Sequence, residues 1–148
     1  MKVILFLFLL IFSYQITYSC TCEAPSQRKN FRKSEAVFVG KVLEIKESNN
    51  NRVADSIGMN KVYDITFEVE KSWKDKTSKQ ITVVSDNGYL VCGGFPFAVG
   101  KQYLVYAKGK DLIVISDCDR TVPIDAGEKD IKNLNSFWFR FFSRIIPF

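Results

Sequence analysis

The positions of apolar and polar residues along the chain predict a domain built mainly of β-strands. Val, Ile, Leu and aromatic residues concentrate, in partial alternation with polar ones, in residues 36–45, 61–73, 79–85, 102–107 and 112–116. β-Branched and aromatic side chains in such short runs are typical of strands. Gly40 interrupts the first run and predicts a bulge or bend, and residues 108–111 between the last two runs predict a hairpin turn.

Two short helices are expected on either side of these strands. Residues 23–34 are polar and basic, and they predict a short helix or turn after Pro25. Nearer the carboxyl end, Asp125 is followed at the third position by Glu128. This is the spacing at which a capping side chain and an acidic residue satisfy the first free N–H groups of a helix. We therefore expect a second helix that is capped by Asp125.

The connections between these elements indicate a single domain. Residues 48–60 predict a long polar loop, and residues 86–88 carry a turn signal after the third strand. Five short strands with short flanking helices fit a five-stranded Greek-key barrel of the OB-fold class, which limits exposed sheet edges by closing nearly on itself. The sequence contains no internal repeat, so residues 20–135 are expected to form this one mainly β domain.

The amino-terminal residues have the three parts of a signal peptide. Lys2 precedes an apolar run over residues 3–12, and Thr17 and Ser19 provide small side chains at a cleavage site. The run is shorter than the ~20 residues that a membrane-spanning helix needs. We expect residues 1–19 to be removed and the mature protein to be secreted with Cys20 first; an uncleaved anchor is the alternative.

Residues 136–148 form an aromatic tail with an amphipathic pattern. On a helical wheel its polar side chains fall on one side, while Phe, Trp and Ile fill the rest; the polar residues are Ser136, Arg140, Ser143 and Arg144. The apolar side chains of such a segment must be shielded from water. The segment can fold back over the barrel, lie in a membrane interface, or occupy a groove of a partner protein.

The amino-acid composition excludes several classes of enzyme. The chain has 21 Lys and Arg, 16 Asp and Glu and no histidine, for a net charge of +5. Without histidine there is no Ser-His or Cys-His nucleophile, no imidazole base and no His-ligated zinc. We expect a binding protein rather than an enzyme, with no cofactor of its own and no nucleic-acid partner. The one basic cluster, residues 28–33, is interpreted as a solvated helix face or as a contact for anionic surfaces.

Four cysteines lie in the exported part, where disulfides are the expected state. A bond between Cys20 and Cys22 would close a small strained ring, so each is expected to pair with either Cys92 or Cys118. Each crosslink would stabilise the fold by about 4 kcal/mol in the chain-entropy model. Both crosslinks would tie down the amino-terminal end of the mature chain, at Cys20 and Cys22. Three other interpretations of the cysteines are open. The disulfides only stabilise a small domain, the thiolates carry redox or metal chemistry, or Cys20 is lipidated.

Several short motifs occur together in one order along the chain. They are Cys20-Thr21-Cys22, Phe31, Ser34-Glu35, Val91-Cys92-Gly93, the segment from Gly100 to Val105, and Asp117-Cys118-Asp119 before Val122-Pro123. In this order they resemble the amino-terminal domain of the tissue inhibitors of metalloproteinases (TIMP), over nearly all of residues 20–135. The resemblance implies a netrin-like OB barrel in which Cys20 pairs with Cys92 and Cys22 with Cys118.

The chain also departs from that family. Arg32 stands where the inhibitors usually have a third early cysteine, and we expect no counterpart of their cysteine-rich carboxy-terminal domain. Glu23 replaces the usual small apolar residue beside the reactive segment. The missing cysteine bears on the stability of the fold, and Glu23 bears on the range of proteases that the protein would bind.

The resemblance implies that the protein inhibits zinc metalloproteases as a secreted monomer. The α-amine and carbonyl of Cys20 would chelate the zinc of the target, and Thr21 would enter its specificity pocket. Cys22 and the loop Val91-Cys92-Gly93 would complete the reactive site. The alternative is a non-inhibitory netrin-like binding module, associated with a surface or membrane through residues 136–148.

Overall fold

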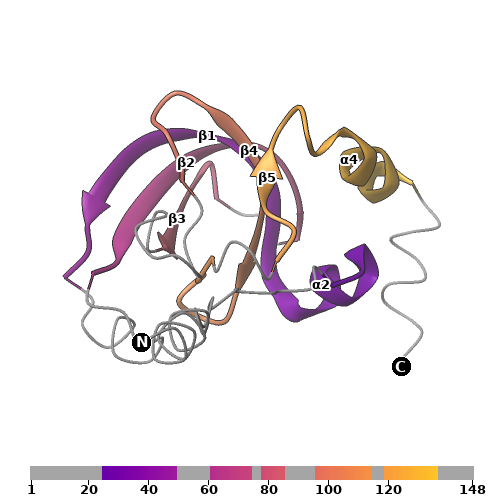
Figure 1. Cartoon of the computed structure of the whole chain (residues 1–148), viewed down its shortest axis with the longest axis horizontal. Coiled ribbons are helices and arrows are strands. Elements are labelled where there is room, and N and C mark those ends of the chain that lie inside the picture. The colour runs from indigo at the N-terminus through magenta and orange to yellow at the C-terminus, as the bar shows by residue number, and fades with distance from the viewer. Residues whose placement is uncertain (1–24, 50–60, 75–77, 86–95, 115–118, 137–148) are drawn as a thin grey trace, which may run out of the picture.

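The computed structural model describes residues 25–49, 61–74, 78–85, 96–114 and 119–136, which form a mainly β domain (Figure 1). Its elements, in chain order, are α2 (Gln27–Lys33), β1 (Ser34–Glu47), β2 (Tyr63–Lys74), β3 (Gln80–Ser85), β4 (Gln102–Lys108), β5 (Val122–Pro123) and α4 (Glu128–Asn135). The predicted mainly β class with two short helices is confirmed. Within the described residues, neither helix is long and apolar enough to cross a membrane.

The strands form one antiparallel sheet in the order β3-β2-β1-β4-β5. The long central strand β1 pairs with β2 along its length and with β4 over its first half. Its register with β2 shifts between Val39 and Gly40, which confirms the predicted bulge. A Cβ atom at Gly40 would lie 2.7 Å from the carbonyl oxygen of Glu68, so the close approach of the two strands requires glycine there.

A short segment after β4 links β4 to the edge strand β3 of the curved sheet. Ile113 bridges Lys108 in antiparallel fashion and Val84 of β3 in parallel fashion. The N–H of Val84 donates to the carbonyl of Leu112 at 3.2 Å, and the N–H of Val114 donates to the carbonyl of Val84 at 2.9 Å. The reversal predicted at residues 108–111 is therefore present.

One prediction near the carboxyl end is wrong, and one strand there was not predicted. The predicted cap Asp125 is wrong, because α4 begins at Glu128 and its N-cap is Gly127, which has no side chain to accept a hydrogen bond. The N–H of Gly127 instead donates to the carbonyls of Pro123 and Ile124, both at 3.1 Å, so residues 124–127 form a turn before the helix. The edge strand β5 was not expected from the sequence.

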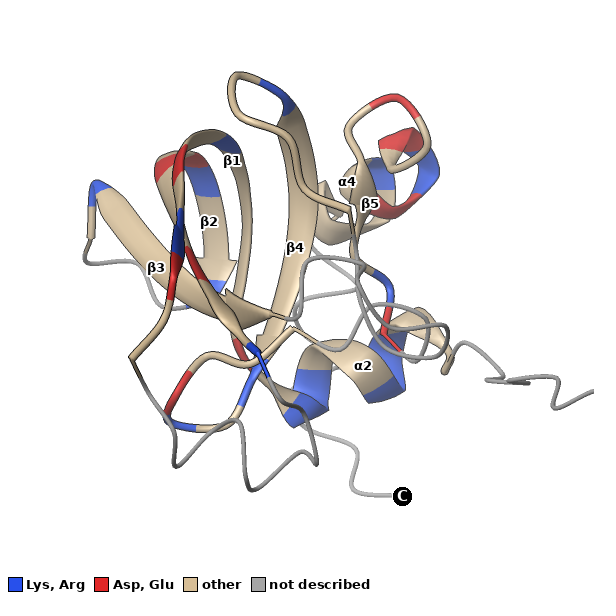
Figure 2. Ribbon diagram, turned by 60° about the vertical axis from the view of Figure 1, so that its left-hand side comes forward, with Lys and Arg blue, Asp and Glu red and all other residues tan. Residues whose placement is uncertain are grey.

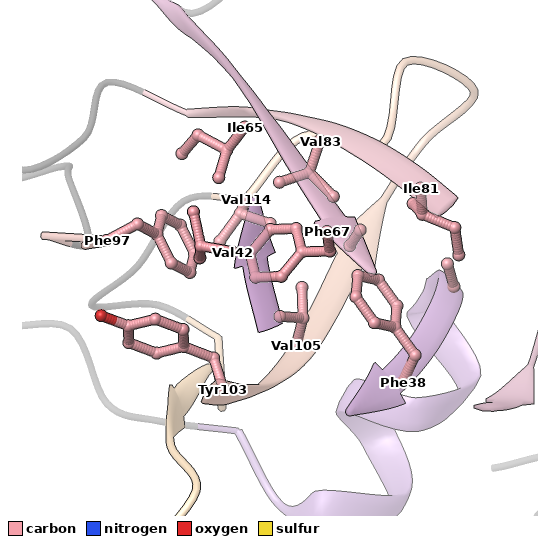
Figure 3. Packing of buried hydrophobic residues seen from close by; sticks show 12 residues of the cluster. Phe38, Val42, Ile65, Phe67, Ile81, Val83, Phe97, Tyr103, Val105 and Val114 are labelled. Carbon is pink, nitrogen blue, oxygen red and sulfur yellow. The ribbon is translucent and has the colours of Figure 1, made fainter. Parts of the chain in front are cut away.

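Both faces of the sheet are covered by buried side chains. Successive side chains of β1 point to opposite sides, so this strand contributes to both faces. On the concave side Phe67 meets the rings of Phe38 and Phe97 edge to face, with centroids 5.4 Å apart in each case, and Tyr103 at 6.5 Å (Figure 3). On the other side the helices cover a second cluster, whose buried members are Phe31, Val37, Val39, Trp73, Leu104, Tyr106 and Leu134. Burial on both faces explains the continuous apolar run in β1.

Several sequence predictions fall outside the described ranges. These are the signal peptide at residues 1–19, the polar loop over residues 50–60, the turn at residues 86–88, and the tail after residue 136. They stay predictions.

Candidate functional site

The predicted reactive site lies outside the residues that the structure describes. This holds for all of its members and for all four cysteines, namely Cys20, Thr21, Cys22, Val91, Cys92, Gly93 and Cys118. The structure does describe the residues that follow two of these segments. Pro25 begins the described chain after the predicted Cys20-Thr21-Cys22 segment, and Asp119 and Arg120 follow Cys118.

An ion pair joins Arg120 to Asp130. The guanidinium of Arg120 donates to both carboxylate oxygens of Asp130, through Nε at 2.6 Å and Nη2 at 2.7 Å. Asp130 is buried in α4, with 10% of its side chain exposed. The hydrogen bond to Asp130 raises the pKa of Arg120 above its ordinary value, so the guanidinium stays charged. Such two-pronged pairs fix direction as well as distance.

The same arginine contacts the start of the described chain. Its Nη1 donates to the carbonyl oxygen of Pro25 at 3.4 Å. The main chain that leads out of the predicted reactive segment is therefore held by a side chain two positions beyond Cys118. Arg120 therefore links the start of the described chain to α4.

A second set of hydrogen bonds ties α2 to α4. Gln27 Nε2 donates to the carbonyl of Asp130 at 2.8 Å and to the hydroxyl of Tyr106 at 3.3 Å, and Asn133 Nδ2 donates to Gln27 Oε1 at 3.1 Å. The hydroxyl of Tyr106 lies 3.4 Å from the carboxylate of Asp130. Burial raises the pKa of Tyr106 well above its ordinary value, so it stays a neutral donor. We call Gln27, Tyr106, Arg120, Asp130 and Asn133 the anchor network.

Helix α2 is held at both ends, which fixes the chain at Pro25. The side chain of Ser26 accepts a hydrogen bond from the N–H of Lys29 at 3.4 Å and acts as the N-cap. At the other end the ammonium of Lys74 donates to the carbonyls of Arg32 at 3.3 Å, Phe31 and Ser34. A cation at this end also complements the negative end of the helix dipole.

The residues that follow Cys118 are held against β4. Asp119 Oδ1 accepts from the N–H of Thr121 at 2.9 Å, and the hydroxyl of Thr121 accepts from the N–H of Tyr106 at 3.0 Å. Both side chains are buried. The chain therefore has a fixed path on this side of the predicted Cys118 crosslink.

Sequence reasoning missed the anchor network, although one signal was available. Asp130 is four residues before Leu134, so the helical period places a carboxylate on the apolar face of α4. A buried carboxylate requires a cation or several donors. No spacing rule identifies Arg120 as that cation, because the strand pairing brings it there.

Within the described ranges, no group of three or more Cys, Asp and Glu side chains is placed to hold a metal ion. Comparisons with models of known protein families and with curated proteins gave no match.

Proposed function

We propose that the protein is a secreted inhibitor of zinc metalloendopeptidases that acts through the amino terminus of its mature chain at Cys20. The observation that supports this proposal is the anchoring of Pro25. The hydrogen bond from Arg120 and the cap at Ser26 fix the chain three residues after Cys22, where the segment that would bind the protease ends. A binding segment that is attached to a fixed point of the fold loses less conformational freedom on binding. More of its contact energy therefore contributes to affinity.

The scaffold that we propose is a netrin-like OB-fold. Three described features support it: β1 pairs with both β2 and β4, residue 113 bridges β4 in antiparallel fashion, and the same residue bridges β3 in parallel fashion. A five-stranded Greek-key barrel needs connections of this kind to close. We extend the domain to residues 20–135 on this basis.

The contact between Arg120 and Pro25 also agrees with a disulfide between Cys22 and Cys118. Cys22 lies three residues before Pro25, and Cys118 lies two residues before Arg120. Three extended residues span at most about 10 Å, and a disulfide needs Cα atoms about 5.5 Å apart. The 3.4 Å hydrogen bond from the Arg120 side chain to Pro25 supports this pairing, because it holds together the two parts of the chain that follow Cys22 and Cys118. We propose the second disulfide between Cys20 and Cys92.

The proposed inhibition needs only main-chain donors from Cys20. A catalytic zinc keeps one position for water and can expand to five ligands, so the α-amine and carbonyl oxygen of one residue would displace the water and close a five-membered chelate ring. The amine has an ordinary pKa of about 8, so losing its proton to the metal at neutral pH costs little. The side chain of Thr21 then enters the specificity pocket beside the zinc.

Addition of one alanine before Cys20 tests this mechanism. It converts the amine into an amide, a poor zinc donor, and leaves the described core intact. We expect inhibition of secreted zinc endopeptidases to fall by orders of magnitude at unchanged thermal stability. An alanine added after Phe148 is the matched control and should inhibit like the native protein. If the two extended proteins inhibit equally well, chelation is the wrong mechanism and a non-inhibitory binding module is favoured.

A further inference from the structure

Helix α2 presents a dense set of positive charges to solvent. Four of its seven residues are Lys or Arg, and all four are exposed: Arg28, Lys29, Arg32 and Lys33. The helix contains no acidic residue, and its inner face buries Asn30 and Phe31. Figure 2 shows the resulting blue bands along the outer side of α2. We call the four side chains the α2 basic face.

These charges are not neutralised by the rest of the described protein. The ion pairs found there join Lys46 to Glu44, Lys61 to Glu47 and Arg120 to Asp130, and none includes the α2 basic face. Exposed like charges one turn apart repel one another and weaken an isolated helix. The protein keeps them nevertheless, and it holds the helix in place with Phe31 packed below and Lys74 at its end.

The spacing of the cations matches a linear anion. Arg28 lies one turn from Arg32, and Lys29 lies one turn from Lys33, so the four charges form two rows with about 6 Å between successive members. Because the helix is capped and packed, the rows exist before a ligand arrives. A polymer that repeats its charges can contact both members of a row without bending.

We propose that the α2 basic face binds a linear sulfated polysaccharide. Sulfate groups require only exposed cations, and the face offers nothing else. Each cation alone gains little near an anionic membrane, and stable attachment needs apolar side chains or a lipid chain beside the charges. A single-stranded nucleic acid would require exposed aromatic rings for stacking. The large exposed hydrophobics of the described residues are Leu43 and Val99, and neither belongs to α2.

Salt dependence provides the first test, with heparin as the probe and the full-length mature protein as the sample. Each cation that neutralises a sulfate releases a counterion. Using the coefficient of about 0.7 per contact for single-stranded polyanions, four contacts should lower the affinity about 50-fold between 50 and 200 mM salt. Two contacts should lower it only about sevenfold. Neutral dextran should not bind at either salt concentration.

A pair of charge-matched variants provides the second test. Arg28→Gln with Lys29→Gln removes half of the α2 basic face with a good helix former, at the helix end where positive charge is unfavourable. The control, Lys46→Gln with Lys101→Gln, removes the same charge from exposed residues outside α2. We expect the first variant to show the sevenfold salt effect and the control to keep the 50-fold effect, both with native thermal stability.

Three results would overturn the proposal. Equal losses in the two variants would mean that heparin responds to net charge alone. Failure of the wild-type protein to bind heparin at 50 mM salt would exclude the site. Tighter binding to vesicles that contain phosphatidylserine than to heparin would assign the face to a membrane instead. All three are separate from protease inhibition, which these measurements do not use.

Discussion

Arg120→Met should be among the most destabilising single changes outside the apolar core. The substitution keeps most of the side-chain volume but removes both donors to the carboxylate of Asp130. In the anchor network that carboxylate would then retain only the hydroxyl of Tyr106, at 3.4 Å. Breaking a buried ion pair from one side typically costs 3–5 kcal/mol, because an uncompensated charge is left behind.

The exposure of the pair decides where in that range the cost falls. Arg120 keeps 31% of its side chain exposed and Asp130 keeps 10%, so water partly solvates the carboxylate after the change. We therefore expect a loss of about 3 kcal/mol, the lower end of the range. A small domain has roughly 5–15 kcal/mol in total, so the effect is large.

Urea unfolding at neutral pH without added reductant measures this loss. The double variant Arg120→Met with Asp130→Leu removes both charges and should recover most of it, ending within about 1 kcal/mol of the native protein. If the double variant is as unstable as Arg120→Met, the loss comes from packing and not from a stranded charge. A loss below 0.5 kcal/mol in the single variant would refute the reasoning altogether.

Two further predictions concern burial and close packing. Because burial raises the pKa of Tyr106, the unfolded state should lose this proton first, so stability is full below pH 10 and falls above it by up to about 1.4 kcal/mol per pH unit. Tyr106→Phe should make that alkaline fall shallower in urea unfolding from pH 9 to 11.5, and parallel profiles would contradict this. Gly40→Ala should lower the free energy of unfolding by about 2 kcal/mol, because its Cβ would lie 2.7 Å from the carbonyl of Glu68; an unchanged melting temperature would contradict it.

The strands β1 to β4 could be predicted because their pattern is local. Residues 112–116 were also predicted as a strand, but the described part of that run forms isolated bridges at Ile113 and no strand. β1 (Ser34–Glu47) alternates between two buried faces, and its one glycine marks the bulge. β5 (Val122–Pro123) could not be predicted, since two residues carry no period and its pairing depends on the position of β4. The cap of α4 was misplaced because the turn at residues 124–127 satisfies the N–H of Gly127 through the main chain, which no side-chain signal reveals.

The candidate site also has one part that the sequence predicts and one part that it does not. The cysteines and Thr21 could be identified from sequence because their chemistry depends on residue type and spacing, and their arrangement stays a prediction. The anchor network could not be identified, since Gln27 and Arg120 meet Asp130 only after the sheet has formed. Local patterns define the helices and strands of this protein, whereas a long-range polar contact fixes the chain at Pro25, after the predicted reactive segment.

Metal coordination by Cys20 is the central claim, and a cobalt-substituted protease tests it most directly. Zinc has a filled d shell and no visible spectrum, whereas Co²⁺ in the same site absorbs according to its ligands. When the mature protein is added to a secreted zinc endopeptidase that carries Co²⁺, we expect the visible spectrum to change in step with loss of peptide cleavage. The form extended by one alanine should leave the spectrum unchanged. Full inhibition by the native protein without any spectral change would contradict the account.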